Sequence, residues 1–225
     1  MASFYDAASG ALRGVYDRHV RTPPVLEVDR YFPGHRAFER EWRAIRAECL
    51  SLMGEMGAIP EFHELMAEQA ALSKYGGRYW RLFVLRAYGA NHRANQALCP
   101  TLRRLLAEDR AVTSAAFSIL EGGKHIPAHR GPFRGVLRYH LPLVIPADAP
   151  NRLRVDGESY VLREGRGILW DDTYEHEAWN DSRGPRAVLL LDVLRPGMPP
   201  ALGFLTRAIV AGVGLVWRLT GRGRH

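Results

Sequence analysis

The sequence has few cysteines and few lysines, and these shortages narrow the class of protein. Cys49 and Cys99 are the only 2 cysteines among 225 residues, which is too few for a disulfide scaffold and leaves no CxxC pair spaced for zinc. There is no lysine-rich block, and the helix-turn-helix, zinc-finger and basic-helix patterns of DNA-binding proteins are also missing, so we expect no nucleic-acid partner. The absence of heptads and of repeats of about 20–50 residues excludes coiled coils and solenoids.

The N-terminus lacks the continuous apolar stretch of a signal peptide. Charged residues such as Asp6, Arg13 and Asp17 interrupt the first 20 residues. We therefore expect a cytoplasmic protein, either free or peripheral on the inner face of the membrane. The formal net charge of +7, carried almost entirely by arginine, favours an anionic partner.

The composition is that of one folded domain, and the first half has helical periodicity. Hydrophobic residues make up 47% of the chain, enough for one sizeable core. Apolar residues recur at steps of three and four through residues 36–57, which predicts one helix between Pro33-Gly34 and Gly57. Shorter helices are expected over 61–73 and 97–109, and an aromatic strand over 79–88.

The second half changes to short strands separated by Gly, Pro, Asn and Asp turns. The predicted strands span residues 112–120, 134–145, 152–155, 158–163, 167–171 and 186–194. This pattern is typical of an antiparallel sandwich or barrel and not of βαβ units. We expect a mostly β domain whose core spans residues 111–197, with an integral N-terminal helical layer over residues 1–110.

Residues 198–225 form an apolar and basic C-terminal segment. The stretch 201–219 is strongly apolar but is borderline in length for a membrane span and carries Arg207 within it. Three interpretations stay open: a helix lying on a membrane surface, a helix packed on the barrel or on a second subunit, and a true span. The arginines of the tail, through Arg222 and Arg224, would suit anionic headgroups. The sequence predicts no particular oligomeric state.

Histidines and an arginine are spaced through the strand-rich half in a way that suggests metal chemistry. His129 lies in a loop, bounded by Gly and Pro, over residues 124–132, and His176 follows 47 residues later among carboxylates. Arg186 opens the next apolar strand. Two imidazoles can hold iron with open coordination positions, and a buried cation can pair with a carboxylate of 2-oxoglutarate. Strand alternation also places Arg138 and His140 on one face.

At these residues the chain resembles the aspartyl/asparaginyl β-hydroxylase family of Fe(II)/2-oxoglutarate dioxygenases. The resemblance covers residues 112–196 and rests on His129-Arg130-Gly131-Pro132 and on the stretch from Asp171 to Trp179. Residues 25–111 resemble bacterial members, including the lipid A and ornithine-lipid acyl-chain hydroxylases. The resemblance implies a double-stranded β-helix, which is a jelly-roll or cupin-like barrel.

The resemblance also implies roles for single residues. His129 and His176 would be the iron ligands, and Gly131 stands where a facial triad would have Asp or Glu. Asp172 would orient a water that completes this catalytic site. Four residues would bind the cosubstrate 2-oxoglutarate: Ser118, Arg138, His140 and Arg186. The implied cofactors are Fe(II), 2-oxoglutarate and O2, and the implied reaction is hydroxylation of an unactivated C–H bond.

Simpler interpretations exist for several of these positions. His140 could be an ordinary core histidine and Arg138 a surface residue of its strand. His125 could be a loop histidine bonded to the backbone, and Asp171 a turn residue. Trp170 and Trp179 could belong to the core or to a pocket wall. Glu175 and Glu177 could be solvated or could support the metal ligands.

Two substrates and one non-catalytic alternative remain. The apolar C-terminal segment and the basic charge favour the acyl chain of a membrane lipid, of lipid A or ornithine-lipid type. The alternative substrate is the β-carbon of Asp or Asn in a peptide or an amino-acid-like molecule. A cupin-like binding module that has lost its chemistry is a third possibility, against which the joint presence of His129, His176 and Arg186 argues.

Overall fold

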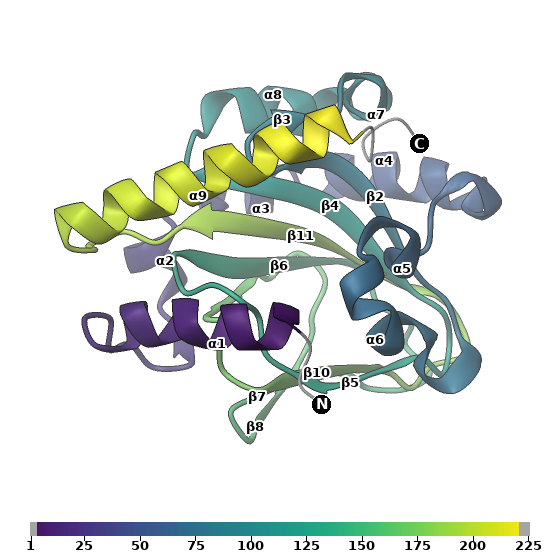
Figure 1. The fold of residues 1–225 in the computed structure, drawn as a ribbon. Helices are drawn as coiled ribbons and strands as arrows, with labels where there is room; N and C mark the ends of the chain where they lie inside the picture. Colours follow the sequence, from purple (N-terminus) through teal and green to yellow (C-terminus); the bar gives the residue numbers. More distant parts are fainter. Residues whose placement is uncertain (1–3, 221–225) are drawn as a thin grey trace.

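A computed structural model describes residues 4–220, so the arginines predicted at 222 and 224 lie outside the described residues. Two antiparallel sheets form the centre of the molecule (Figure 1). The large sheet contains, in spatial order, β1 (Val25–Leu26), β9 (Ile168–Trp170), β6 (Val136–Val144), β11 (Arg186–Leu194), β4 (Val112–Leu120), β2 (Trp80–Ala87) and β3 (Ala90–Asn91). The small sheet contains β5 (His125–His129), β10 (His176–Asn180), β7 (Asn151–Val155) and β8 (Glu158–Val161). This is the expected double-stranded β-helix.

Helices precede and flank this barrel. They are α1 (Phe4–Asp17), α2 (Val28–Tyr31), α3 (His35–Arg40), α4 (Trp42–Met53), α5 (Phe62–Leu65), α6 (Ala70–Lys74), α7 (Arg93–Leu98), α8 (Pro100–Glu108) and α9 (Pro200–Leu219). Single 3-10 turns, η1 (Met56–Ala58), η2 (Ala67–Gln69) and η3 (Tyr75–Gly77), join some of them. Residues 1–110 therefore supply β1, β2 and β3 to the large sheet as well as the helical layer.

The two faces of the large sheet have different partners because side chains alternate along each strand. Leu137, Tyr139 and Leu141 of β6 point into the main core, which they share with Phe38, Ile45 and other helical residues. Figure 1 shows α3 and α4 behind this sheet. The opposite face looks toward the small sheet across a second core, which includes Trp170 and Leu153. That inner face carries the polar residues discussed below.

The sequence predicts one helix over residues 36–57, but the structure divides this range into two helices. Glu41, with φ −93° and ψ 9°, separates α3 from α4, and α4 ends at Met53, ahead of Gly54. Glycine is a poor helix former, so the chain leaves the helix at Gly54 and then makes only one 3-10 turn, Met56–Ala58, which contains Gly57. The predicted helix over 61–73 is likewise divided into α5, η2 and α6.

The predicted loop over residues 124–132 is also wrong, because His125–His129 is strand β5. Pro127 argues against a central strand, but β5 lies at the edge of the small sheet, where a residue without an N–H group is tolerated. His176 lies beyond β9 and opens strand β10. The strands predicted over 79–88, 112–120 and 186–194 are confirmed within one residue at each end.

Candidate active site

Two histidines face each other across neighbouring strands of the small sheet. His129 ends β5 and His176 begins β10, and the two are direct partners in the antiparallel register. Their ring centroids lie 4.2 Å apart. The predicted iron ligands are therefore side by side although 47 residues separate them.

Both imidazoles are held in the same tautomer by the backbone. His129 Nδ1 lies 2.8 Å from the carbonyl oxygen of Pro127, and His176 Nδ1 lies 3.0 Å from that of Tyr174. A carbonyl can only accept, so each Nδ1 donates and each Nε2 keeps its lone pair. Burial lowers the pKa of His129, and burial together with the neighbouring His129 lowers the pKa of His176 well below its usual value. Both rings are thus neutral at pH 7, which is the form that binds a metal.

The large sheet presents the predicted cosubstrate residues toward this pair. In the strand register, Leu190 of β11 lies opposite His140, Asp192 lies opposite Arg138, and Val188 lies opposite Ser118. Because every second residue shares a face, Ser118, Arg138, His140 and Arg186 point to the same side of the sheet. Four side chains from three strands therefore converge on the space between the sheets.

Two of these side chains are buried with unused hydrogen-bonding atoms. Both ring nitrogens of His140 and the Nε of Arg186 are buried and have no hydrogen-bond partner in the described part of the chain. Arg186 donates from Nη1 to the carbonyl oxygen of Trp179 at 3.0 Å, and burial lowers its pKa to about 10, so it remains a cation at pH 7. A buried cation without a carboxylate partner is costly, and a bound carboxylate would remove that cost. These atoms fit an acidic ligand beside the histidine pair.

Asp172 occupies the position beside Gly131. The Gly131 N–H donates to the backbone oxygen of Asp172 at 2.6 Å, and a Cβ atom at position 131 would overlap the Asp172 carboxylate. That carboxylate pairs with Arg138 at 3.1 Å, and its Oδ1 is buried without a partner among the described residues. Burial raises the pKa of Asp172 to about 6, against the opposing effect of Arg138.

Asp192 was not singled out from the sequence, yet it belongs to this site. Its Oδ1 accepts a hydrogen bond from Arg138 Nε at 3.0 Å, so Arg138 lies between two carboxylates. The sequence feature that could have pointed to Asp192 is its place within the apolar strand 186–194, because burying a charge there without a partner would cost free energy. Trp80 was also missed, and its indole N–H donates to Ser118 at 3.0 Å.

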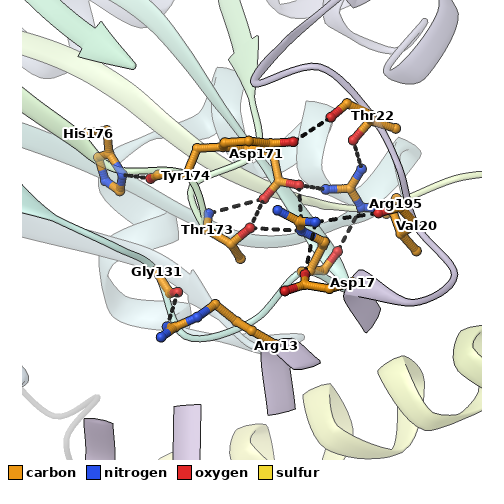
Figure 2. Close-up of polar contacts among 11 residues, drawn as sticks. Arg13, Asp17, Val20, Thr22, Gly131, Asp171, Thr173, Tyr174, His176 and Arg195 are labelled. Atoms are coloured by element: carbon orange, nitrogen blue, oxygen red, sulfur yellow. Dashed lines mark hydrogen bonds and ion pairs between the residues drawn. The ribbon is translucent and has the colours of Figure 1, made fainter. Parts of the chain in front are cut away.

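A second polar cluster anchors the segment before His176 (Figure 2). Asp171 is fully buried and accepts from Arg195 at 2.5 Å and from the hydroxyl of Thr173 at 2.6 Å. Arg195 also donates to Thr22, and Arg13 of α1 donates to the backbone oxygen of Gly131 at 3.0 Å. Asp171 is therefore a buried structural anchor that ties the N-terminal segment to the loop leading into β10.

The remaining candidates have structural partners. His125 contacts the carboxylate of Glu177 at 2.9 Å and stacks on Trp179. The interpretation of His125 as a loop histidine bonded to the backbone is therefore wrong. Glu177 is buried and pairs with Arg154, whereas Glu175 stays exposed. Trp170 is buried in the core between the sheets.

A groove of about 140 Å³ begins at the histidine site. His129, Arg138, Asp172 and Asp192 line its polar end. Most of its other lining is apolar and comes from α5, β2, β4 and α9: Phe62, Leu65, Met66, Leu82, Val84, Ala87, Ala116 and Trp217. An apolar groove that ends at a few convergent polar groups is typical of a site for a small or chain-like molecule.

The mostly β barrel, the histidine pair and the polar side chains that face it together define a double-stranded β-helix protein with a candidate metal site. Residues 39–196 match the family model described as aspartyl/asparaginyl beta-hydroxylase. The chain belongs to the aspartyl/asparaginyl β-hydroxylase family.

Individual relatives include proteins with different named substrates. The ornithine lipid ester-linked acyl 2-hydroxylase of Rhizobium tropici is 37% identical over 182 residues, which cover 80% of this chain and 63% of that protein. The human aspartyl/asparaginyl beta-hydroxylase is 31% identical over 173 residues, covering 73% of this chain and 21% of that protein. The chain thus spans less than two thirds of either relative. Among solved structures, a Pseudomonas putida prolyl-4-hydroxylase aligns with a TM-score of 0.43 and 17% identity, over 71% of this chain and 88% of that one.

Proposed function

We propose that this protein is an Fe(II)- and 2-oxoglutarate-dependent dioxygenase that hydroxylates the acyl chain of a membrane lipid. The observation that carries the proposal is the pair His129 and His176, whose Nδ1 atoms are both bonded to backbone carbonyls and whose Nε2 atoms are left for a metal. Family membership supports the same chemistry. Two histidines with open positions suit ferrous iron.

His129 and His176 would hold the iron, and no further protein ligand is needed at position 131. Among the described residues, no group of three or more His, Cys, Asp or Glu side chains is arranged to hold a metal ion. When bound, ferrous iron supplies the O2 activation that couples decarboxylation of 2-oxoglutarate to succinate with hydroxylation of a C–H bond. Asp172 would orient a water at the site through its free Oδ1, while Arg138 and Asp192 hold the Asp172 side chain in place.

The buried side of the site would bind the cosubstrate. Arg186 would pair with the distal carboxylate of 2-oxoglutarate, because its buried guanidinium has no carboxylate partner among the described side chains. His140 and Ser118 would contact the same molecule from neighbouring strands. Arg138 would contribute positive charge near the iron.

The lining of the groove favours an acyl chain as substrate. The groove leaves the polar end between α5 and β2 and reaches Trp217 of α9 along mainly apolar side chains. Apolar surface of this kind gains free energy from covering a hydrocarbon chain, at roughly 25 cal/mol per Å². The named activity of the Rhizobium tropici relative is on an ester-linked acyl chain, next to a carbonyl, which agrees with this lining.

Comparative lipid mass spectrometry tests the proposal. The wild type, His176→Ala and the control His19→Ala, which changes an exposed histidine outside the lining of the groove, are expressed in a bacterium that makes ornithine lipids and lipid A. We expect lipids heavier by one oxygen atom with the wild type and with His19→Ala only. Oxygen added to Asp or Asn residues instead would give the alternative substrate. Unmodified lipids and peptides, with no succinate formed by the purified protein, would favour a binding module without catalytic activity.

A further inference from the structure

The C-terminal helix α9 has one face on the barrel and one face in solvent. Leu202, Thr206, Val210, Gly214 and Trp217 are buried against the domain. Gly214 makes this close approach possible, because a Cβ atom there would overlap the backbone oxygen of Tyr88. The helix is thus docked along the domain, and in Figure 1 no other element covers its outer side.

The outer face of α9 is apolar from end to end. It consists of Ala201, Phe204, Ala208, Gly212, Leu215, Val216 and Leu219, all exposed. Phe204 and Leu219 are each 77% exposed, and Leu215 is 55% exposed. These residues extend over about 27 Å at 1.5 Å per residue. Among the described helices, only α9 is long and apolar enough to cross a membrane by length and composition, with a mean hydropathy of 1.5.

Arginines border this face on one side. Arg207 and Arg218 lie eleven residues apart, which is three helical turns, so both stand on the same edge of α9. They line a groove between α9 and the end of the large sheet together with Arg86 and Arg110. The described residues that line it include no Asp or Glu, and neither Arg110 nor Arg218 has an ion-pair partner among the side chains that the structure describes. The border of the outer face is therefore cationic.

The arginine-lined groove adjoins the groove of the active site. Arg86 and Tyr88 line both of them, and α9 contributes Trp217 to one and Arg218 to the other. A molecule with an anionic head and an apolar chain could therefore span the two along α9.

We propose that α9 is an interfacial membrane helix, whose outer face enters an anionic bilayer while Arg110, Arg207 and Arg218 bind its phosphate or carboxylate headgroups. A wholly apolar face bordered by cations is the arrangement of helices that lie in the membrane plane. A net charge of +7 attracts an anionic surface and repels a second copy of the same chain. Delivery of the acyl chain into the adjoining groove rests on the proposed function, whereas binding to the bilayer does not.

Flotation with vesicles tests the bilayer contact without any catalytic step. The full chain is mixed with phosphatidylcholine vesicles, or with vesicles that also contain about 30 mol% phosphatidylglycerol. We expect binding to the anionic vesicles that weakens at high salt, and little binding to phosphatidylcholine alone. Phe204→Glu with Leu215→Glu should abolish flotation. Arg207→Glu with Arg218→Glu should reduce the affinity about 25-fold or more, since each basic residue near the surface contributes about fivefold.

Two matched controls separate the α9 face from a general change in hydrophobicity or charge. Val161→Glu changes an exposed apolar residue of β8, and Arg183→Glu changes an exposed arginine in the turn after β10. Both should float like the wild type. Circular dichroism and thermal unfolding show that every variant is folded, and succinate formation by the wild type with a detergent-dispersed lipid reports separately on the proposed function.

Two results would overturn the proposal. One is a wild type that does not float with anionic vesicles, or that floats equally with both kinds. The other is a change in oligomeric state, seen by light scattering, when Phe204 and Leu215 are replaced, with flotation unchanged. The second result would assign the outer face to another copy of the chain.

Discussion

The carboxylate of Asp172 fills the space that a side chain at position 131 would need. The Gly131 N–H is bonded to the Asp172 backbone at 2.6 Å, and any Cβ at position 131 would overlap the Asp172 carboxylate. In a facial triad a third protein ligand stands at this position, two residues after the first histidine. Here the neighbouring loop supplies a carboxylate to the same region and pairs it with Arg138.

Gly131→Asp should therefore fail to create a three-ligand metal site. Overlap with Asp172 should lower the free energy of unfolding by about 1–3 kcal/mol and weaken Fe(II) binding, whereas Gly131→Asp with Asp172→Gly should recover part of both. Thermal unfolding and anaerobic Fe(II) titration measure the two effects. Gly57→Asp is the control, because nothing lies within 4 Å of a Cβ there. Tighter iron binding by Gly131→Asp alone, at unchanged stability, would show that the carboxylates do not compete for this space.

Replacing Arg186 should affect the cosubstrate more than the metal. Arg186→Met removes the buried cation, and a hydrogen bond to a charged group contributes about 1.5–3 kcal/mol, so KM for 2-oxoglutarate should rise roughly 10- to 150-fold. Fe(II) affinity should stay the same, and Arg183→Ala at an exposed position should change neither quantity. Steady-state succinate formation gives KM. An unchanged KM for Arg186→Met would place the carboxylate of the cosubstrate elsewhere.

The histidine pair and the strand arginine could be predicted from the sequence because local motifs carry them. The strands that hold the two histidines could not, since Pro127 masks β5 and carboxylates surround His176 in β10. The pairing of Arg138 with Asp192 depends on the register of β6 against β11, which has no local signal. The place of Trp217 in the lining of the groove likewise depends on contacts between segments that are distant in the sequence.

The ion pair between Asp171 and Arg195 should be important for stability. Both side chains are almost completely buried and their atoms lie 2.5 Å apart. Asp171→Asn should lower the free energy of unfolding by about 3–5 kcal/mol, because it leaves the buried Arg195 without a carboxylate partner. Arg195→Met should cost less, because Asp171 keeps its pair with Arg134 at 3.1 Å. Arg152→Met is the comparison, since Arg152 pairs with Asp181 at 2.9 Å in an exposed position and should cost less than about 1 kcal/mol. Urea unfolding measures all three variants, and equal costs would contradict the role of burial.

The two thiols should be unreactive in the folded protein. They should also make the free energy of unfolding fall at alkaline pH. Cys49 and Cys99 are buried, and burial raises the pKa of each to about 12. Little thiolate exists at pH 8, so a thiol reagent should modify neither residue until the chain is unfolded. Because the folded pKa lies above the unfolded one, this contribution to stability is complete below pH about 9 and is lost as pH rises toward 12. Cys49→Ala with Cys99→Ala should show a shallower loss of stability over that range, and an equal slope would contradict the assignment.

The most direct test of the central claim is a reaction of the purified protein under ¹⁸O₂ with Fe(II), 2-oxoglutarate and ornithine lipid. A 2-oxoglutarate-dependent hydroxylase should place one labelled atom in succinate and one in the acyl chain, and His176→Ala should form neither product. Labelled lipid formed equally without 2-oxoglutarate, or by His176→Ala, would contradict the account.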